Sequence, residues 1–531
     1  MARDDDDRRA FETARQMTGG SMLTRNAERY PDKAAFVEEG REIPYGQLDE
    51  RIHQVARSLA DLGVGHGDRV ALLMGNAMPT VEVYFGCFRI GAIGVPVNLR
   101  FVAAEVAYVL ANSGSKVLVV DETFAETAAA AAAQVPELER IVVVGSTEAA
   151  GPGALSWDEV TGSASRSPFG AVVDEGDPAT IMYTSGTTGR PKGAVLTHKN
   201  LSMAALSALI EQKISKSDEV WYLNLPLFHI SGLSAIFPYM TIGGTCVIAQ
   251  LGAFDARKAL DDLERYQVTA ACFVGPQWQD ILALPDVGSR RYALRRVIWG
   301  TSQAIVPLIE AIHDTFTEAE IFNCFGQTEM SPTTCMLHAE FFEQKKGSVG
   351  KPLINVEARI VDDDMDDVKQ GEVGEIVYRG PTVMKEYWEM PEATEEAFAG
   401  GWFHSGDLCR QDEEGFIYVV DRKKDMIISG GENIYSAEVE AAIVRHEKVR
   451  DVAVIGVGHH RWGETPRAVV VPADFADPPT EEELLAHCQE QMASYKKPTS
   501  FIVLEGDLPR NAMGKVTKAR LRELYGGPVE A

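Results

Sequence analysis

Cysteine is scarce and widely spaced in this sequence. Only seven of the 531 residues are cysteines, and the closest pair, Cys324 and Cys335, is eleven positions apart. This spacing excludes a Cys-x-x-Cys metal or redox motif and disfavours a disulfide framework. Free cysteines without such a framework are typical of a reducing compartment, so we expect a cytoplasmic protein.

Positive charge is also in short supply. The chain has 51 Lys and Arg against 78 Asp and Glu, which gives a formal net charge of −27. Because such a chain is repelled by nucleic-acid backbones, we expect no nucleic-acid partner. An anionic substrate would need a local group of cations. Hydrophobic residues make up 45% and charged residues 24%, an ordinary globular composition that excludes a disordered or fibrous chain.

We expect no signal peptide, because the N-terminal MARDDDDRRAF is too highly charged for one. One stretch lacks charge altogether: residues 220–254 contain no Asp, Glu, Lys or Arg. Its length would admit a membrane span. However, Pro226, Pro238 and several glycines divide it, and His229 lies within it. This pattern predicts a buried core or an apolar pocket rather than an integral membrane span.

Strand and helix patterns alternate along the first part of the chain. Helical periodicity occurs at 45–63, 81–92 and 127–134, and short strands are indicated at 68–74, 116–121 and 140–145. The alternation recurs from 215 to 325. Such alternation is typical of an α/β fold in which helices cover both faces of a parallel sheet. We therefore expect a large N-terminal domain of parallel-rich sheets flanked by helices.

The pattern changes after residue 345. Segments 371–381 and 413–430 are predicted to be hairpins of a small β-rich subdomain, and the Asp-rich 362–367 a solvated turn. The remaining pattern predicts a small α+β domain, with a helix from Ala437, strands at 451–457 and 467–472, and a helix at 481–492.

The most informative segment is YTSGTTGRPKGA, residues 183–194. Its glycines allow backbone N–H groups to approach phosphates, its hydroxyls donate hydrogen bonds, and Arg190 and Lys192 supply positive charge. It is not a Walker A loop, because Pro191 and Gly193 stand where that motif needs Gly and Ser or Thr. After the strand-like ATIMYT, the segment predicts a phosphate-binding loop.

This loop resembles the signature of the adenylate-forming (AMP-binding) superfamily, which includes acyl-CoA synthetases, peptide-synthetase adenylation domains and firefly luciferase. The resemblance extends from about Glu28 to Arg522 and is carried, in family order, by 183–194, 225–233, 325–329, 402–408, 421–440 and 508–515. It implies an N-terminal AMP- and acyl-binding domain over 1–421 and a mobile C-terminal domain over 422–531, with a hinge near Lys424.

The family chemistry implied is the activation of a carboxylic acid by ATP to an acyl-AMP plus pyrophosphate, followed by transfer to a thiol. Mg²⁺ is the expected cofactor, with ATP and CoA as co-substrates. Thr328 would contact the α-phosphate, Glu329 would be the metal ligand, and Lys515 would bridge the carboxylate and the α-phosphate. The β- and γ-phosphates would be held by Thr184, Ser185, Gly186, Thr187, Thr188, Gly189 and Lys192.

The resemblance also assigns the nucleoside contacts. Asp407 would accept from the ribose hydroxyls, with Arg422 as their second partner. The adenine turn departs from the usual GGAP, because Ser302-Gln303-Ala304 stands there and Gln303 adds bulk. The GGEN turn would close the CoA channel with Gly430, Gly431 and Glu432.

The acid is expected to be apolar. Peptide-synthetase adenylation domains hold an amino group with an Asp, and the uncharged 220–254 offers none. The expected acyl wall is Phe228, His229, Phe273, Trp278 and Met330. Similarity to bacterial fatty-acid–CoA ligases favours a fatty acid, with an aryl acid such as a benzoate or cinnamate as the alternative.

Free CoA is the expected acceptor, because only sixteen residues follow Lys515. Three other interpretations stay open: an acyl-AMP ligase that loads a separate carrier protein, a luciferase-like oxygenase, and a nucleotide-binding regulator without turnover. The expected partners are small molecules, and a homodimer is compatible with the sequence.

Overall fold

The computed structural model describes residues 11–12, 14–184, 191–300, 306–430, 432–511 and 514–529. The chain forms two compact units. The first comprises residues up to Glu357 together with Tyr378–Phe403, and the second comprises Ala358–Val377 together with the chain from His404 onward. The expected domain boundary at residue 422 lies inside the second unit. Rotation of the C-terminal domain about a hinge near Lys424 remains a prediction.

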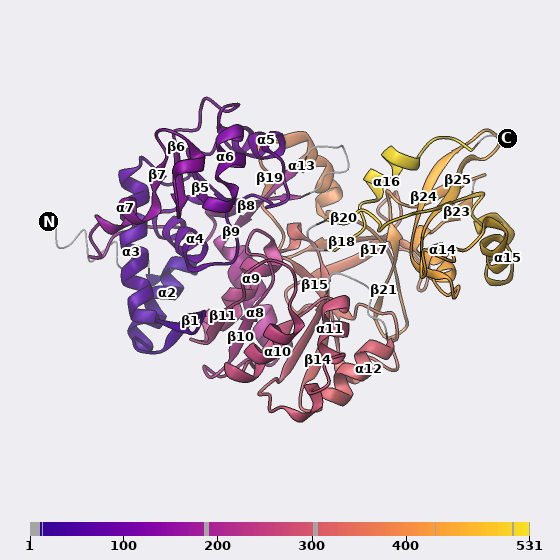
Figure 1. Ribbon diagram of the computed structural model, residues 1–531, viewed down its shortest axis with the longest axis horizontal. Coiled ribbons are helices and arrows are strands. Elements are labelled where there is room, and N and C mark those ends of the chain that lie inside the picture. The colour runs from indigo at the N-terminus through magenta and orange to yellow at the C-terminus, as the bar shows by residue number, and fades with distance from the viewer. Residues whose placement is uncertain are drawn as a thin grey trace. The chain divides into compact units, whose positions relative to one another are not determined.

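One sheet of the first unit has the strand order β19-β9-β8-β4-β3-β5-β6-β7. Figure 1 labels β5 to β9 and β19 of this sheet. Strands β3 to β8 pair in parallel, whereas β8–β9 and β9–β19 are antiparallel. The strands are β3 (Arg69–Leu73), β4 (Ile93–Pro96), β5 (Val117–Asp121), β6 (Arg140–Val144), β7 (Leu155–Ser156), β8 (Pro178–Thr184), β9 (Lys192–Thr197) and β19 (Glu386–Tyr387).

The helices that accompany this sheet are α2 (Gly19–Arg29), α3 (Tyr45–Asp61), α4 (Met78–Ile90), α5 (Ala103–Ser113), α6 (Ala125–Ala132), α7 (Trp157–Gly162) and α13 (Pro391–Ala397). Three of them, α3, α4 and α6, lie where helical periodicity predicted helices at 45–63, 81–92 and 127–134. The buried residues of these three helices are mostly apolar, and α4 ends where Gly91 adopts a positive φ of 72°.

The other sheet of the first unit has the order β16-β15-β14-β13-β12-β10-β11-β1-β2. Its strands are β1 (Ala34–Glu38), β2 (Arg41–Pro44), β10 (Val220–Leu223), β11 (Thr245–Ile248), β12 (Ala270–Cys272), β13 (Arg296–Gly300), β14 (Glu320–Gly326), β15 (Thr333–His338) and β16 (Lys351–Pro352). Its helices are α8 (His198–Glu211), α9 (Ile230–Thr241), α10 (Ala256–Arg265), α11 (Gly275–Leu282) and α12 (Val306–Thr315).

The two sheets are joined through helices. Helix α8, which follows β9, packs on α9, which follows β10, and α2 packs on both α4 and α9. The rings of Phe88 on α4 and Phe237 on α9 lie 6.1 Å apart within this buried layer. The uncharged 220–254 therefore contributes β10, α9 and β11 to the interior, as predicted. Across the described residues, no helix combines the length and apolar character that a membrane span requires.

The second unit contains two further sheets, with the orders β17-β18-β20-β21 and β23-β22-β25-β24, and β26 beside β25. Their strands are β17 (Glu357–Val361), β18 (Gly374–Arg379), β20 (Phe403–Gln411), β21 (Ile417–Arg422), β22 (Ile427–Ser429), β23 (Glu432–Ile434), β24 (Val449–His459), β25 (Gly463–Pro472) and β26 (Ser500–Val503), accompanied by α14 (Ser436–Ile443), α15 (Glu481–Gln491) and α16 (Lys518–Tyr525).

Both predicted hairpins are wrong in their pairing. Residues 371–381 supply only β18, and residues 413–430 supply β21 and β22, which lie in different sheets. The turn after β21 is held to other segments, because the Lys423 N–H donates to Gly406 O and Asp425 pairs with Arg522 at 2.7 Å. These bonds carry the chain into a new sheet instead of returning it along β21. Residues 362–367 form a turn, as predicted.

All seven cysteines are free thiols, six buried and Cys324 partly buried. This agrees with the expectation that no disulfide framework supports the fold.

Candidate nucleotide and acid site

Four of the predicted site residues follow strands that end at one edge of the second sheet of the first unit. Strands β10, β12, β13 and β14 are parallel, so their carboxyl ends share an edge. His229 follows β10, Phe273 directly follows β12, and Thr328 and Glu329 follow β14. Ser302, Gln303 and Ala304 follow β13 in sequence but lie outside the described residues.

The strand order identifies a crevice at this edge. In the run β11-β10-β12-β13-β14, the chain leaves β10 for one side and later returns past it to β12. In open α/β sheets, ligands bind beyond the carboxyl ends of the strands where such a reversal occurs. The segments after β10 and β12, which carry His229 and Phe273, border this reversal.

The segment predicted to bind phosphates connects β8 to β9. Thr184 and Lys192 are directly opposed across the two strands, at the base of the connection. The predicted contacts Ser185, Gly186, Thr187, Thr188 and Gly189 lie outside the described residues.

The Glu329 carboxylate is buried, with 8% of the residue exposed. It lies in the 3₁₀ turn η4 (Thr328–Met330). The Thr184 hydroxyl donates to its Oε1 at 3.3 Å, and the Tyr387 hydroxyl donates to the same oxygen at 2.9 Å. Two elements distant in sequence, β8 and β14, are thus brought together at one carboxylate.

Lys192 contacts the aromatic ring of Tyr387, the same residue that donates to Glu329. Its Nζ lies 5.1 Å from the centroid of Tyr387, within the range of a cation–π interaction. Burial, followed by the neighbouring Glu329, raises the pKa of Tyr387, which keeps the phenol protonated as a donor. Three predicted residues (Thr184, Lys192 and Glu329) therefore surround a tyrosine that the sequence analysis missed.

In the second unit, Asp407 and Arg422 form a cross-strand ion pair. They are opposed in register on β20 and β21, with Arg422 Nε 2.5 Å from Asp407 Oδ1. The Asp407 side chain is 3% exposed and that of Arg422 is 40% exposed. Asp407 is thus held in one orientation, while Arg422 keeps a surface that a ligand can reach.

Lys515 lies in a turn of the same unit. Asn511 closes the turn, because its side chain accepts from the Lys515 N–H at 3.0 Å and its own N–H donates to Lys515 O. Gly514 has a φ of +77°, which favours glycine at this position. Although Lys515 is an exposed residue, loss of water around its ammonium lowers its pKa. Arg422 lowers that pKa further and Asp407 raises it.

The predicted hinge and CoA-channel residues lie on the surface of the second unit. Lys424 is exposed in the turn between β21 and β22. Gly430 has a φ of +60° and donates its N–H to Trp462 O at 2.9 Å, and Glu432 is exposed on β23. Gly431 lies outside the described residues. The roles of these residues remain predictions.

The predicted acyl wall is largely interior. The rings of Phe273 and Trp278 are fully buried in edge-to-face contact, with centroids 5.0 Å apart, and Met330 is also fully buried. His229 caps helix α9, accepting from the Ser231 N–H at 3.2 Å. Packing in the core accounts for the apolar character of Phe273, Trp278 and Met330, and capping of α9 accounts for His229. Contact of these residues with an acid remains a prediction.

The donor set fits one Mg²⁺ bound mainly through its substrate. Among the residues with described positions, no group of three or more His, Cys, Asp or Glu side chains is arranged to hold a metal. Mg²⁺ in nucleotide sites is commonly bound by one or two carboxylates plus substrate phosphates. The single carboxylate of Glu329, beside the phosphate-loop strands, meets that requirement.

Comparison with known proteins supports the same conclusion. Residues 23–388 match the AMP-binding enzyme family, and residues 438–515 match the AMP-binding enzyme C-terminal domain. Feruloyl-CoA synthase from Amycolatopsis is 38% identical over 96% of this chain and 99% of its own. The 2-succinylbenzoate–CoA ligase of Bacillus velezensis is 36% identical over 96% of this chain and 98% of its own.

A solved structure extends the match to the fold. The o-succinylbenzoate CoA synthetase of Bacillus subtilis, determined with ATP and magnesium, is 33% identical and covers 94% of this chain and 99% of its own, with a TM-score of 0.83. With the ordered motifs and the nucleotide-site geometry, these matches show that the chain belongs to the AMP-binding enzyme family, as an AMP-forming acid–thiol ligase of the adenylate-forming superfamily that uses ATP, Mg²⁺ and CoA.

Proposed function

We propose that this protein is an aryl-acid CoA ligase, which converts an aromatic carboxylic acid to its acyl-AMP and then to its CoA thioester. The observation that carries this proposal is the 38% identity to feruloyl-CoA synthase over nearly the full length of both chains. The similarity to 2-succinylbenzoate–CoA ligase, which also acts on an aromatic acid, supports it. The fatty acid favoured by the sequence analysis has less support than its aryl alternative.

Charge neutralisation explains how the residues would serve the first step. The acid and ATP are both anionic, so alignment requires cations and hydrogen-bond donors at the phosphates. Lys192 and Thr184 stand at the base of the phosphate-loop connection. We propose that Glu329 holds Mg²⁺, which would supply further neutralisation of the phosphates when bound.

The acid carboxylate would attack the α-phosphorus, and the bond from that phosphorus to pyrophosphate would break. The ammonium of Lys515 would stabilise the two anionic groups as they meet, and the Asp407–Arg422 pair would orient the ribose. In the second step the CoA thiolate would attack the acyl carbon, and AMP would leave with the bonding electron pair.

The apolar surroundings of the β10–β12 reversal suit a neutral aromatic ring. His229 and Phe273 border this reversal, and the segment from Val220 to Phe254 has no charged side chain that would need a partner. Burying an unpaired charge beside these walls would be unfavourable. An aryl or arylpropenoic acid with no charge other than its reacting carboxylate therefore fits the proposed pocket better than an amino acid.

A matched acid panel tests the proposal. The enzyme is incubated with ATP, Mg²⁺, CoA and either a hydroxycinnamate, a benzoate or straight-chain fatty acids, and AMP, pyrophosphate and thioester are measured. We expect one AMP per thioester and the highest kcat/KM with an aromatic acid. A fatty acid as the best substrate would overturn the aryl assignment, and transfer to a carrier protein but not to CoA would overturn the acceptor assignment.

The predicted acyl wall has its own test. His229→Ala or Phe273→Ala should alter the ratio of kcat/KM between two aromatic acids more than the KM for ATP, because these residues border the acid rather than the nucleotide. Trp221→Phe, a change of another buried aromatic on β10, serves as the control. An unchanged acid profile in both alanine variants would show that the acid binds elsewhere.

A further inference from the structure

We infer that Tyr387 is a positioning residue that orients the Glu329 carboxylate toward the magnesium–nucleotide complex. The inference rests on the proposed nucleotide role of Glu329 and deepens it. Tyr387 belongs to none of the motifs that carried the family resemblance, and it lies 58 residues from Glu329 in sequence.

The two side-chain hydrogen bonds that the described residues make to the Glu329 carboxylate are directed to the same oxygen. Tyr387 donates to Oε1 at 2.9 Å and Thr184 donates to Oε1 at 3.3 Å. Within the part of the chain that the structure describes, Oε2 accepts no hydrogen bond. Two hydroxyls therefore fix the plane of the carboxylate and leave Oε2 as the oxygen that can bind a cation.

The Tyr387 bond is the shorter of the two, and its donor is held by the backbone. Strand β19 is the edge strand of its sheet and pairs with β9, so Lys385 N–H donates to Val195 O at 2.9 Å and Trp388 N–H to Gly193 O at 2.7 Å. On the other side, Met384 N–H donates to Glu329 O at 2.7 Å. The segment 384–388 thus joins the phosphate-loop strand to the turn that carries Glu329.

The ring of Tyr387 performs a second task. Because Lys192 Nζ lies 5.1 Å from the ring centroid, the aromatic face attracts the cation while the hydroxyl binds the anion. One side chain therefore contacts two oppositely charged groups assigned to the same nucleotide. This arrangement allows the two contributions to be separated, since Phe keeps the ring and loses only the hydroxyl.

Loss of the hydroxyl should weaken metal-dependent nucleotide binding in particular. Outer partners that orient a metal ligand typically contribute about 10–100-fold to metal affinity. We expect Tyr387→Phe to reduce the gain in nucleotide affinity that Mg²⁺ provides by on the order of tenfold. Binding without Mg²⁺ should change little, because the ring beside Lys192 remains.

The experiment is isothermal titration calorimetry with a non-hydrolysable α,β-methylene ATP, performed on the full chain in Mg²⁺ and in EDTA. Tyr222→Phe is the matched control, because the Tyr222 hydroxyl also donates to a carboxylate, Asp262 Oδ2 at 3.0 Å, on elements β10 and α10 that carry no assigned nucleotide residue. The control should keep the full Mg²⁺ gain. A full gain in Tyr387→Phe would overturn the inference.

Two further variants show whether Tyr387 acts through Glu329. If it does, Glu329→Gln should abolish most of the Mg²⁺ gain, and adding Tyr387→Phe should cause little further loss. Additive losses in the double variant would overturn the inference. If the Phe variant does not fold, Tyr387→His carries the same test: its shorter donor should give a reduced gain, and a full gain would count against the inference.

The titration contains neither acid nor CoA. A failed thioester assay would therefore contradict the proposed function without affecting this result, and a full Mg²⁺ gain in Tyr387→Phe would contradict the positioning role without affecting the proposed function.

Discussion

The Glu329 side chain must satisfy its hydrogen bonds in a buried position and, as we propose, also bind Mg²⁺. Burying the carboxylate of a residue that is only 8% exposed would be unfavourable without hydrogen bonds, and the hydroxyls of Thr184 and Tyr387 provide them. The same two bonds orient the carboxylate beside the strands of the phosphate loop. A substitution of Glu329 can therefore preserve the fold only if the new side chain has a similar shape and keeps a hydrogen-bond acceptor at the position of Oε1.

Glu329→Gln meets that condition, since its amide oxygen can accept both hydroxyl bonds while the negative charge is lost. We expect adenylation to slow by about 10²–10³-fold, the usual effect of losing one such electrostatic contact. Pyrophosphate release at saturating Mg²⁺ measures it, with the thermal unfolding midpoint as the control for folding. A near-normal rate would show that the carboxylate is structural.

His198 illustrates the opposite case, a buried titratable group with no assigned chemistry. It is fully buried at the start of α8, and its ring lies 5.1 Å from that of Phe88. Neither ring nitrogen has a hydrogen-bond partner within the described part of the molecule. Burial lowers the pKa of His198 to about 4, with a further lowering by His66 and an opposing effect of Asp177.

A pH dependence of stability follows from this shift. The folded-state pKa lies below the ordinary 6.5, so between about pH 6.5 and 4 the unfolded chain binds more protons than the folded chain. Acidification should therefore cost the wild type up to about 1.4 kcal/mol per pH unit relative to His198→Leu. Urea denaturation of both proteins from pH 7.5 to 4.5 checks this. A constant difference across that range would contradict it.

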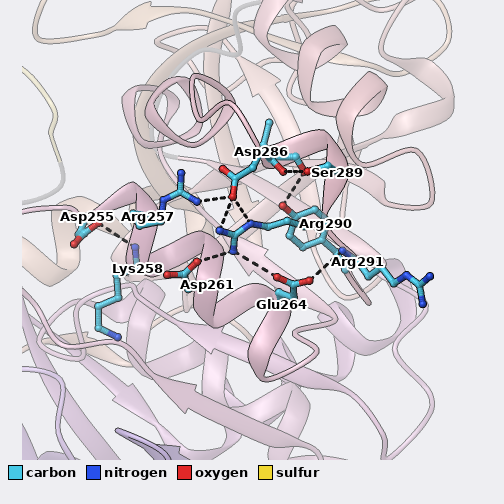
Figure 2. A network of polar contacts seen from close by, with 11 residues as sticks. Asp255, Arg257, Lys258, Asp261, Glu264, Asp286, Ser289, Arg290 and Arg291 are labelled. Carbon is cyan, nitrogen blue, oxygen red and sulfur yellow. Dashed lines mark hydrogen bonds and ion pairs between the residues drawn. The ribbon is translucent and has the colours of Figure 1, made fainter.

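At the scale of elements, a network of charged side chains links helix α10 to the chain around Arg290. Figure 2 shows Arg290 between acidic residues of α10 and the chain around η3 (Val287–Ser289). Arg290 contacts Asp286 at 2.7 Å and Asp261 at 2.6 Å, and Asp286 also contacts Arg257 at 2.7 Å. Hydrogen bonds from Arg257 and then Arg290 hold the pKa of Asp286 well below its usual range.

Arg290→Ala should lower the thermal unfolding midpoint, because the carboxylates of Asp261, Glu264 and Asp286 lose a shared partner. The loss should shrink as NaCl is raised, since salt screens the pairs that remain exposed. Arg166→Ala is the control, because the exposed pair Arg166–Glu50 is 4.0 Å apart and should contribute little. Equal effects of both substitutions at low salt would show that the network does not stabilise α10.

At the scale of the whole molecule, the residues that we assign to adenylation are divided between the units. Thr184, Lys192 and Glu329 belong to the first unit, whereas Asp407 and Lys515 belong to the second. The family resemblance implies that the C-terminal part rotates about Lys424 between adenylation and thioester formation. The exposed turn that carries Lys424 connects two sheets within the second unit.

Lys515→Ala should therefore block acyl-AMP formation while leaving the reaction of synthetic acyl-AMP with CoA close to the wild-type rate. Lys424→Pro should show the reverse defect, because proline fixes the backbone φ at the hinge. Single-turnover kinetics of each half-reaction measure both, with Lys424→Ala as the control for losing the side chain alone. Equal damage to both steps in Lys515→Ala would contradict the domain alternation.

The sequence by itself determined the chemistry and most of the elements. The phosphate loop, the FGQTE turn and the Lys515 turn are contiguous segments, and each contains the residue types that its role requires. Helix α3 and strand β5 were likewise predictable, because their periodicity depends on neighbours a few positions apart.

Only the tertiary structure decided which distant residues meet. Tyr387 reaches Glu329 because β19 joins the edge of β9, and strand order in a sheet is set by packing between segments rather than by local pattern. The same reason explains the wrong hairpin at 413–430, where alternation predicted two strands correctly but could not show that β21 and β22 belong to different sheets. Periodicity specifies which face of an element is buried, whereas the partner of that face is selected by the whole fold.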